Sequence, residues 1–335
     1  MTHTICMIPG DGIGPEVSQA TRQVLDASGA RIEWITLPAG AAAADVHGDV
    51  LPARTLGAIR EHQVAIKGPI TTPIGKGFAS VNVQLRKALN LYAAVRPVRS
   101  MPGIKTRYED VEIVVIRENS EGLYSGLENE IVPGVVESLK IATRTGCERI
   151  ARFAFDYARK RHRKRVTVFH KANIMKMSDG LFIECARKVH KETAADIAYD
   201  EFIIDNGCMQ LVTDPTRFDM LLLENFYGDV ISDLCAGLVG GLGVVPGANF
   251  GDDTAVFEAV HGSAPDIAGK GVANPLALIM SGVMMLNHIG EPAAADRIKA
   301  AYNAVLQEGN LAERTRDIGG TAGTRQFTEA LLRRM

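Results

Sequence analysis

The amino-acid sequence predicts an α/β fold, and three observations support this expectation. Short apolar runs rich in β-branched residues alternate along the chain with longer helical segments. The chain has 335 residues, of which 46% are hydrophobic and 23% charged, so it can bury a sizeable core and form two domains. No internal repeat, linker or low-complexity segment interrupts the alternation.

The expected elements follow from the apolar runs and from helix-start signals. The strands are expected at Ile5–Ile8, Ile32–Leu37, Gln63–Lys67, Val111–Ile116, Val166–His170 and Met220–Leu223. Several of the helical segments open on a proline, which fits the first turn of a helix. The helices are expected at Pro15–Ser28, Val81–Leu89, Glu148–Arg161, Lys176–Val189, Asp229–Val239, Pro275–His288 and Pro292–Glu308.

The pattern changes between Glu121 and Arg144. Three short β-rich runs follow one another there, and a Pro133-Gly134 turn separates the first from the second. We therefore expect an antiparallel projection, or arm, built from the runs Glu130–Val132, Val135–Val136 and Ser138–Ile141.

The charge and cysteine content exclude several classes of protein. A formal net charge of -2 gives no basic footprint for nucleic acid or for a membrane surface. The five cysteines are scattered and never spaced as CxxC, which argues against a disulfide framework and against a zinc site. The sequence also lacks a signal peptide, an Arg-rich presequence and an apolar run of about 18 residues. We expect a cytoplasmic protein that binds neither nucleic acid nor membranes.

One glycine motif resembles a dinucleotide-binding fingerprint. Gly10-Asp11-Gly12-Ile13-Gly14 follows an expected strand and opens an expected helix. It reads GxGxG rather than GxGxxG, and no acidic residue clearly closes the unit about 20 residues later. We interpret the motif as a tight turn, which glycine permits, rather than as a Rossmann nucleotide site.

Two carboxylates, Asp229 and Asp233, stand four residues apart at the expected start of a helix. At this spacing the side chains share a face with Cβ atoms about 5–6 Å apart, so two unneutralised charges repel each other. A bound divalent cation would reverse that cost. The alternative is a helix cap followed by a solvated acid, because a helix N-terminus tolerates negative charge.

Three arginines, Arg86, Arg96 and Arg117, lie near expected strand and helix ends and are candidate carboxylate clamps. The planar guanidinium pairs bidentately with a carboxylate and keeps its charge. Ser80 and Asn82 add short hydrogen-bonding groups just before Arg86. The alternatives are surface salt bridges for the arginines and a helix cap for Ser80, at the end of a glycine-rich loop at 74–79.

Tyr124 and Lys171 carry acid/base potential. Both side chains titrate near pH 10 in the absence of perturbation, and burial or a neighbouring cation can bring either into a useful range. The alternatives are a tyrosine that packs in the core and a lysine that is solvated.

Several long motifs resemble the β-decarboxylating dehydrogenases, the family of isocitrate, isopropylmalate, homoisocitrate and tartrate dehydrogenases. The similarity extends from Ile8 to about Gly320 and is greatest to the NAD-dependent isocitrate dehydrogenases. The motifs are Thr71-Thr72-Pro73, Arg117-Glu118-Asn119, His170-Lys171-Ala172-Asn173, Gly228-Asp229-Val230-Ile231-Ser232-Asp233 and the segment from His261 to Lys270.

The resemblance implies an isopropylmalate/isocitrate dehydrogenase-like fold that is not a Rossmann fold. It implies a large domain of residues 1–95 and 241–335, a small domain of residues 96–240, and an active site between them. It also implies a homodimer in which an antiparallel clasp at about 121–144 joins the subunits. Each site would then be shared, with Lys171 and Asp205 coming from the partner of the subunit that supplies Asp229.

The same resemblance implies the chemistry. Asp205, Asp229 and Asp233 would hold Mg²⁺ or Mn²⁺, and Lys171 and Tyr124 would be the catalytic proton acceptor and donor. A small tricarboxylate substrate would bind to Ser80, Asn82, Arg86, Arg96 and Arg117. Oxidation would pass a hydride to the nicotinamide, and loss of CO₂ would follow.

The cofactor is expected to be NAD. Asp266 and Ile267 occupy positions where NADP-using relatives carry a cationic residue and an aromatic one, and the Asp266 carboxylate would repel a 2′-phosphate. The expected cofactor-binding residues are Thr72, Asn82, Glu258, His261, Gly262, Ser263, Ala264, Asp266, Ile267 and Asn274.

Isocitrate is the expected substrate, because an isopropyl group would leave Ser80 and Asn82 partly unsatisfied. Homoisocitrate and 3-isopropylmalate remain alternatives within the family. A non-catalytic regulatory subunit of an isocitrate dehydrogenase assembly remains an alternative from another class, although such a subunit should lack part of the site.

Overall fold

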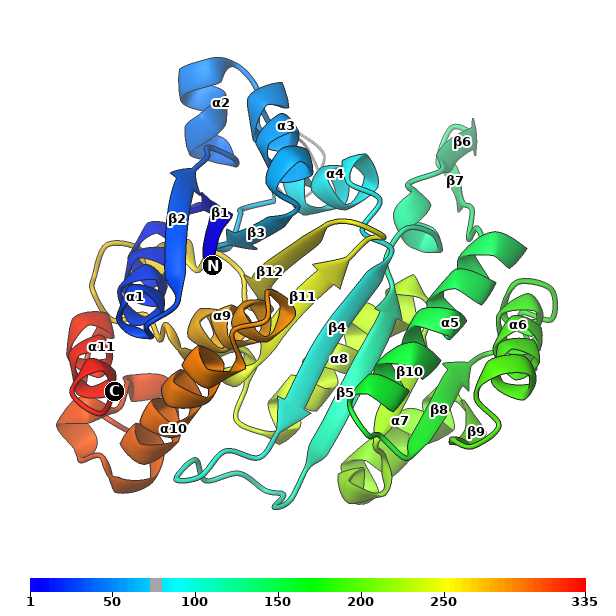
Figure 1. Cartoon of the computed structure of the whole chain (residues 1–335). Helices are drawn as coiled ribbons and strands as arrows, with labels where there is room; N and C mark the ends of the chain where they lie inside the picture. The colour runs from blue at the N-terminus through cyan, green and yellow to red at the C-terminus, as the bar shows by residue number, and fades with distance from the viewer. Residues whose placement is uncertain (73–79) are drawn as a thin grey trace.

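The computed structural model describes residues 1–72 and 80–335 and confirms the expected α/β class. Helices cover both faces of one central sheet of ten strands (Figure 1). Alternate residues of a central strand show the two coverings, because Ile113 and Val115 join one buried apolar cluster while Val114 and Ile116 join another. The predicted loop at 74–79 and Pro73 lie outside the described residues.

The strands are β1 (Thr2–Ile8), β2 (Arg31–Thr36), β3 (Val64–Lys67), β4 (Ala93–Arg99), β5 (Glu112–Glu118), β6 (Glu128–Val132), β7 (Val135–Ser138), β8 (Arg165–His170), β9 (Ala198–Ile203), β10 (Met220–Leu223), β11 (Pro246–Phe250) and β12 (Ala255–Ala259). The order in the large sheet is β2-β1-β3-β12-β11-β4-β5-β10-β8-β9. Both ends of this sheet are parallel, whereas the central strands from β12 to β5 pair antiparallel. The two parallel ends therefore run in opposite directions.

The helices are α1 (Gly14–Ala27), α2 (Ala41–His47), α3 (Ala53–His62), α4 (Val81–Ala88), α5 (Arg144–Lys160), α6 (Ser178–Thr193), α7 (Ile204–Thr213), α8 (Asn225–Leu238), α9 (Leu276–His288), α10 (Pro292–Glu308) and α11 (Thr324–Leu332). Short 3₁₀ turns occupy Leu123–Ser125, Pro215–Arg217, Leu242–Val244, Pro265–Ile267, Leu311–Glu313 and Arg316–Ile318. Within the described residues, no helix combines the length and apolar character that crossing a bilayer requires.

The helix that carries the two acidic residues begins four residues earlier than expected. Glu224 caps α8 by accepting hydrogen bonds from the amides of Phe226 and Tyr227, so the first turn starts at Asn225. Asp229 consequently lies in the second turn, and its expected position at the helix start is wrong. Its carboxylate does not cap the helix; it contacts arginines of the sheet, as described below.

The expected projection is present. β6 and β7 form a separate two-stranded antiparallel hairpin whose residues are all exposed (Figure 1). Pro133 and Gly134 form its turn, with Gly134 at φ 82°, a conformation that glycine adopts without strain. A bridge between Gly122 and Ile141 closes the base of the hairpin.

The central sheet continues without a break through the two regions that the sequence assigns to different domains. Residues 96–240 supply the β5-β10-β8-β9 end, and both chain ends together supply the β2-β1-β3-β12-β11 end. The expected boundary at 95/96 falls within β4. The division into two domains therefore stays a prediction.

Candidate active site

The charged residues of the site that belong to the central strands lie on one face of the sheet. Lys67 of β3 lies directly opposite Glu258 of β12, and Ala94 of β4 lies opposite Arg117 of β5. Only β11 separates these two pairs. Because alternate residues of a strand share a face, Arg96 lies on the same side as Ala94 and Arg117. The register of the sheet therefore fixes where these charges meet.

These side chains line a cavity of about 280 Å³. The structure brings together in its lining most of the residues predicted from the sequence: Ser80, Asn82, Arg86, Arg96, Arg117, Tyr124, Asp229, Asp233, Glu258, His261 and Gly262. Other predicted cofactor residues lie outside this lining: Thr72, Ser263, Ala264, Asp266, Ile267 and Asn274. Lys171 and Asp205 also lie outside it.

Arg117 holds Asp229 in the cavity. Its guanidinium donates to the Asp229 carboxylate through Nη1 and to Asn225 Oδ1 through Nε and Nη2, at 3.1 and 2.7 Å. The Asn225 amide in turn donates to the backbone oxygen of Glu121 at 3.0 Å. A buried arginine whose donors are satisfied in this way is fixed in direction. The first turn of α8 is thereby tied to the end of β5.

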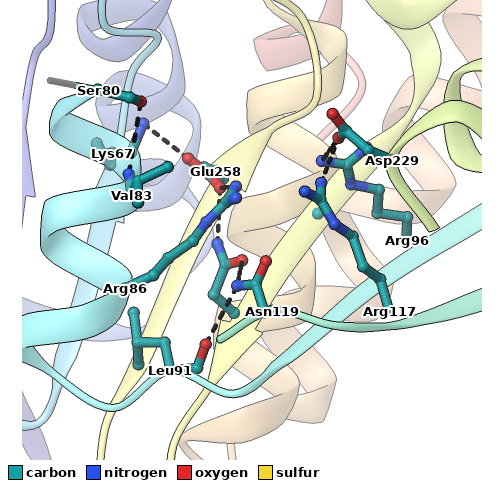
Figure 2. A network of polar contacts seen from close by, with 12 residues as sticks. Lys67, Ser80, Val83, Arg86, Leu91, Arg96, Arg117, Asn119, Asp229 and Glu258 are labelled. Carbon is teal, nitrogen blue, oxygen red and sulfur yellow. Dashed lines mark hydrogen bonds and ion pairs between the residues drawn. The ribbon is translucent and has the colours of Figure 1, made fainter. Parts of the chain in front are cut away.

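Arg96 reaches the same helix from β4. It donates to the Ser232 hydroxyl, and it lies 3.5 Å from Asp229 and 3.4 Å from Asp233. Figure 2 shows the guanidinium groups of Arg96 and Arg117 next to the Asp229 carboxylate. The i, i+4 carboxylates of α8 are thus partly neutralised by two arginines of the sheet, which offsets their mutual repulsion.

The protonation behaviour of the cavity follows from these contacts. Burial opposes the ionisation of Asp229, but Arg117 and Arg96 outweigh it, so the pKa of Asp229 is lowered. Burial raises the pKa of Asp233. Arg96 lowers this pKa, whereas the nearby Asp229 charge raises it further. Burial and the hydrogen bond that Tyr124 donates to Asp229 raise the pKa of the Tyr124 hydroxyl. Asp229 is therefore ionised, and Tyr124 keeps its proton.

The other side of the cavity is built around Glu258. Its carboxylate accepts from Lys67 at 2.7 Å, Arg86 at 3.2 Å and Asn249 at 2.7 Å. Asn249 Oδ1 accepts from Asn119 at 3.0 Å, which links β12 through β11 to the end of β5 (Figure 2). Burial raises the pKa of Glu258, but its cationic partners outweigh this effect and leave the pKa well below its usual range.

The glycine motif forms the tight turn that its sequence indicates. Gly10 and Gly12 have φ values of 83° and 59°, and a Cβ at Gly12 would approach the Ser263 backbone oxygen to 2.1 Å. The Ile13 amide donates to this same oxygen at 2.9 Å. Asp11 accepts from the Ala41 and Thr71 amides at 3.0 Å each. The turn therefore supports the loop predicted to bind the cofactor.

Two buried side-chain atoms of the cavity lack a hydrogen-bond partner within the described part of the chain. They are Asn82 Oδ1 and His261 Nε2. A buried polar atom without a partner is costly and calls for a ligand or water. Both residues are predicted to bind the cofactor, so the cavity wall fits a polar group such as the carboxamide or ribose of NAD.

Asp229 and Asp233 fit a divalent cation, because Mg²⁺ and Mn²⁺ take carboxylate oxygens and fill the remaining positions with water or substrate oxygens. In residues 1–72 and 80–335, however, no three His, Cys, Asp or Glu side chains of one chain group around a metal position. Asp205 instead pairs with Lys171 at 2.5 Å. The predicted third ligand therefore does not join Asp229 within one chain.

Three buried residues of the site were not predicted from the sequence. Lys67 and Asn249 both donate to Glu258, and Asn119 donates to Asn249. The sequence offered only a weak indication of these residues. It is unusual for a lysine to end a buried strand, or for an asparagine to lie within or just after one, because apolar residues dominate there. The structure also shows the role of Glu118 in the Arg-Glu-Asn motif. Its carboxylate accepts from the amides of Ser120 and Glu121 and so shapes the turn after β5.

Comparison with known proteins agrees with this geometry. A model of the isocitrate/isopropylmalate dehydrogenase family matches residues 4–331. Mitochondrial catalytic subunit 5 of NAD isocitrate dehydrogenase from Arabidopsis thaliana is 52% identical, covering 98% of this chain and 87% of that protein. A mitochondrial regulatory subunit of NAD isocitrate dehydrogenase from Dictyostelium discoideum is 49% identical, covering 99% and 91%.

Among solved structures, the crystal structure of isocitrate dehydrogenase from Methylococcus capsulatus matches with a TM-score of 0.96 and 52% identity over 99% of both chains. The predicted fold family is thereby confirmed. Sequence, fold and comparisons agree that the chain belongs to the isocitrate/isopropylmalate dehydrogenase family.

Proposed function

We propose that this protein catalyses the oxidative decarboxylation of isocitrate to 2-oxoglutarate and CO₂, with reduction of NAD. The observation that carries the proposal is the convergence of Arg86, Arg96 and Arg117 with Ser80 and Asn82 on one cavity. Three guanidinium groups suit a tricarboxylate, because each can pair with one carboxylate. Relatives whose names specify NAD-dependent isocitrate dehydrogenases support the choice of reaction and of cofactor.

In the proposed mechanism the arginines bind and orient the substrate, while Asp229 and Asp233, with Asp205 of the partner subunit, hold Mg²⁺ or Mn²⁺. The bound cation would supply Lewis acidity, lowering the pKa of the substrate hydroxyl and stabilising the charge that develops on its oxygen. Lys171 of the partner subunit would take the proton of the substrate hydroxyl, and bound NAD would supply the hydride acceptor. After CO₂ is lost, Tyr124 protonates the carbon that carried it, consistent with a hydroxyl that keeps its proton.

We also propose that the protein is a homodimer. The two helices that carry Asp205 and Asp229 expose apolar side chains, Met209 and Val212 on α7 and Phe226 and Val230 on α8. The exposed hairpin of β6 and β7 adds further apolar surface. The helices α7 and α8 contact each other, and exposed apolar side chains on neighbouring elements favour association with another chain. A second copy docked there would explain why Lys171 and Asp205 lie outside the cavity.

A regulatory subunit is the competing function, because one relative with such a name is about as similar as the catalytic subunits. The cavity contains all three predicted arginines, two of the three predicted metal ligands and Tyr124, which favours catalysis.

The cellular compartment is the last part of the proposal. The five cysteines are free thiols, which suits a reducing compartment. We retain the cytoplasm as a proposal, although these relatives carry mitochondrial names.

Initial rates of the purified chain with Mn²⁺ test the proposal. Isocitrate, homoisocitrate and 3-isopropylmalate are each compared with NAD and with NADP. We expect turnover with isocitrate and NAD. Preference for another substrate would refute the specificity argument based on Ser80 and Asn82, and inactivity with all three would support the regulatory alternative.

A further inference from the structure

A groove of about 1560 Å³ lies on the face of the central sheet opposite the candidate active site. It is lined largely by residues of β4, β5, α5, α9 and α10, and Figure 1 shows α5 and α10 on either side of β4 and β5. Arg99 of β4 and Glu112 of β5 lie opposite each other and both line the groove. Alternate residues of a strand point to opposite faces, so Arg96, three residues before Arg99, points to the other side. The groove is therefore separate from the cavity that holds Arg96.

The groove carries more positive than negative charge. Its lining contains nine Lys or Arg side chains and four Asp or Glu side chains, although the whole chain has a formal net charge of -2. Each of the four acids already pairs with an arginine. Within residues 1–72 and 80–335, six of the nine cations form no ion pair: Arg99, Arg149, Lys160, Arg161, Lys164 and Lys299. A concave surface with an excess of one charge attracts ligands of the opposite charge.

Several of the unpaired cations lie toward one end of the groove. Arg99 is the last residue of β4 and lies opposite Glu112. Glu112 pairs at 2.8 Å with Arg163, which follows α5. This contact places the end of α5, with Lys160 and Arg161, beside the end of β4.

The helix α10 adds another cation at the same end. Arg99 donates to the hydroxyl of Tyr302 at 3.2 Å, which brings α10 to the end of β4. Lys299 precedes Tyr302 by three residues, so the two share a face of the helix. Cations from β4, α5 and α10 therefore line this end, and a group with several anionic oxygens can contact more than one of them.

The other end of the groove is aromatic. The ring of Phe153 on α5 lies 6.0 Å from Tyr92, 6.2 Å from Tyr157 and 5.7 Å from Phe250, measured between ring centroids. His288 of α9 lies 5.7 Å from Phe250. All five rings line the groove, and those of Phe153, Tyr157 and Phe250 are half-buried. Aromatic side chains of this kind offer surfaces on which a planar base can stack.

We propose that this groove is a second binding site, and that its ligand is a nucleoside polyphosphate. The base would lie at the aromatic end, beside Phe153, and the phosphates at the cationic end, beside Arg99 and Lys299. β4 runs from Ala93 to Arg99, which separates the two ends by roughly 20 Å at about 3.3 Å per residue and suits an elongated ligand. The inference does not depend on the proposed reaction, because this site shares no lining residue with the candidate active site.

Calorimetric titration of the purified chain with ATP tests the proposal. EDTA removes divalent cations, isocitrate is omitted, and excess NAD fills the candidate cofactor site. We expect one ATP per chain, with a Kd that rises as NaCl is added. Inorganic tripolyphosphate should bind about tenfold more weakly, because it lacks a base to stack, and adenosine should not bind measurably. No binding of ATP, or equal affinity for ATP and tripolyphosphate, would overturn the proposal.

Two variants locate the bound ATP. Lys160→Met combined with Lys299→Met removes a charge from each wall and should raise the Kd for ATP on the order of tenfold. Phe153→Leu should weaken ATP binding and leave the Kd for tripolyphosphate unchanged. The kcat and KM of both variants with isocitrate should equal those of the wild type, which shows that they fold. Wild-type affinity for ATP in both variants would place the nucleotide elsewhere and overturn the proposal.

The matched control is Lys191→Met on α6. Lys191 is exposed, lies outside the groove and forms no ion pair in the part of the chain that the structure describes. Its removal should leave the Kd for ATP unchanged. A rise equal to that of the lysine double variant would show a general effect of lost charge and overturn the proposal.

A second copy of the chain is the other occupant that the groove could hold. Native mass spectrometry without ATP compares the oligomeric state of the wild type with that of the Lys160→Met, Lys299→Met variant. We expect the same state for both. Loss of a larger assembly in the variant would assign the groove to contacts between copies and overturn the proposal.

Discussion

The proposed sharing of the active site between two subunits predicts that two inactive variants restore each other when they form one dimer. Lys171→Ala removes the proposed proton acceptor, and Asp229→Asn removes a proposed metal ligand. Each variant alone should retain below about 1% of wild-type activity, given the size of acid/base contributions. The question is whether these two residues serve the same site from one chain or from two.

The magnitude of the expected recovery follows from the proposed sharing of the site. Asp229 lines the cavity together with Tyr124, whereas Lys171 pairs with Asp205 outside it. In a mixed dimer of the two variants, one site would therefore carry both substitutions and the other would carry neither. Random assortment makes half of the dimers mixed, and each of these has one intact site, so activity should recover to about a quarter of the wild-type value.

The assay mixes equal amounts of the two variants, exchanges subunits in mild denaturant and measures NADH formation with isocitrate after refolding. Native mass spectrometry reports the fraction of mixed dimers. Each variant carried through the same cycle alone is the control. If mixed dimers form and activity stays at the level of the parents, Lys171 and Asp229 do not meet across a dimer and the reasoning is refuted.

Three other predictions follow from single positions. Gly12→Ala should destabilise the protein by about 1–3 kcal/mol and raise the KM for NAD, because its Cβ would collide with Ser263. The control is Gly57→Ala inside α3, where a Cβ meets nothing within 4 Å, and it should be neutral or stabilising. Equal changes in the Tm of the two variants would contradict this prediction. Glu313→Gln should lower Tm at neutral pH, because Glu313 pairs with Arg333 and Arg334, which lower its pKa to about 2. The difference in Tm between the variant and the wild type should shrink as pH falls from 4.5 toward 2. A difference in Tm that does not depend on pH would be inconsistent with an ionic origin. Asp266→Lys should raise the ratio of kcat/KM for NADP to that for NAD by about tenfold, since it replaces a repulsive charge with an attractive one; an unchanged ratio would exclude Asp266 as the selector.

Strands with a continuous apolar run could be predicted from the sequence, whereas strands that contain polar residues with tertiary partners could not. The runs at β1, β8 and β10 are buried on both faces and are apolar enough to identify alone. β4 and β11 were missed because Arg96, Pro97 and Asn249 interrupt them. Arg96 is accommodated because Ser232, Asp229 and Asp233 of α8 contact it, and Asn249 because it bonds to Glu258 and Asn119; all of these are tertiary contacts.

The site shows the same distinction at the level of single side chains. Asp229 and Arg117 belong to long motifs, and their types alone suggested a metal ligand and a carboxylate clamp. The sequence could not reveal that the two contact each other, since 112 positions separate them along the chain. Nor could it identify Lys67, because a lysine at the end of a strand is ordinarily solvated and only the register of β3 against β12 places it opposite Glu258. The roles of the charged residues therefore depend on tertiary pairing, between β5 and α8 for Arg117 with Asp229 and between β3 and β12 for Lys67 with Glu258.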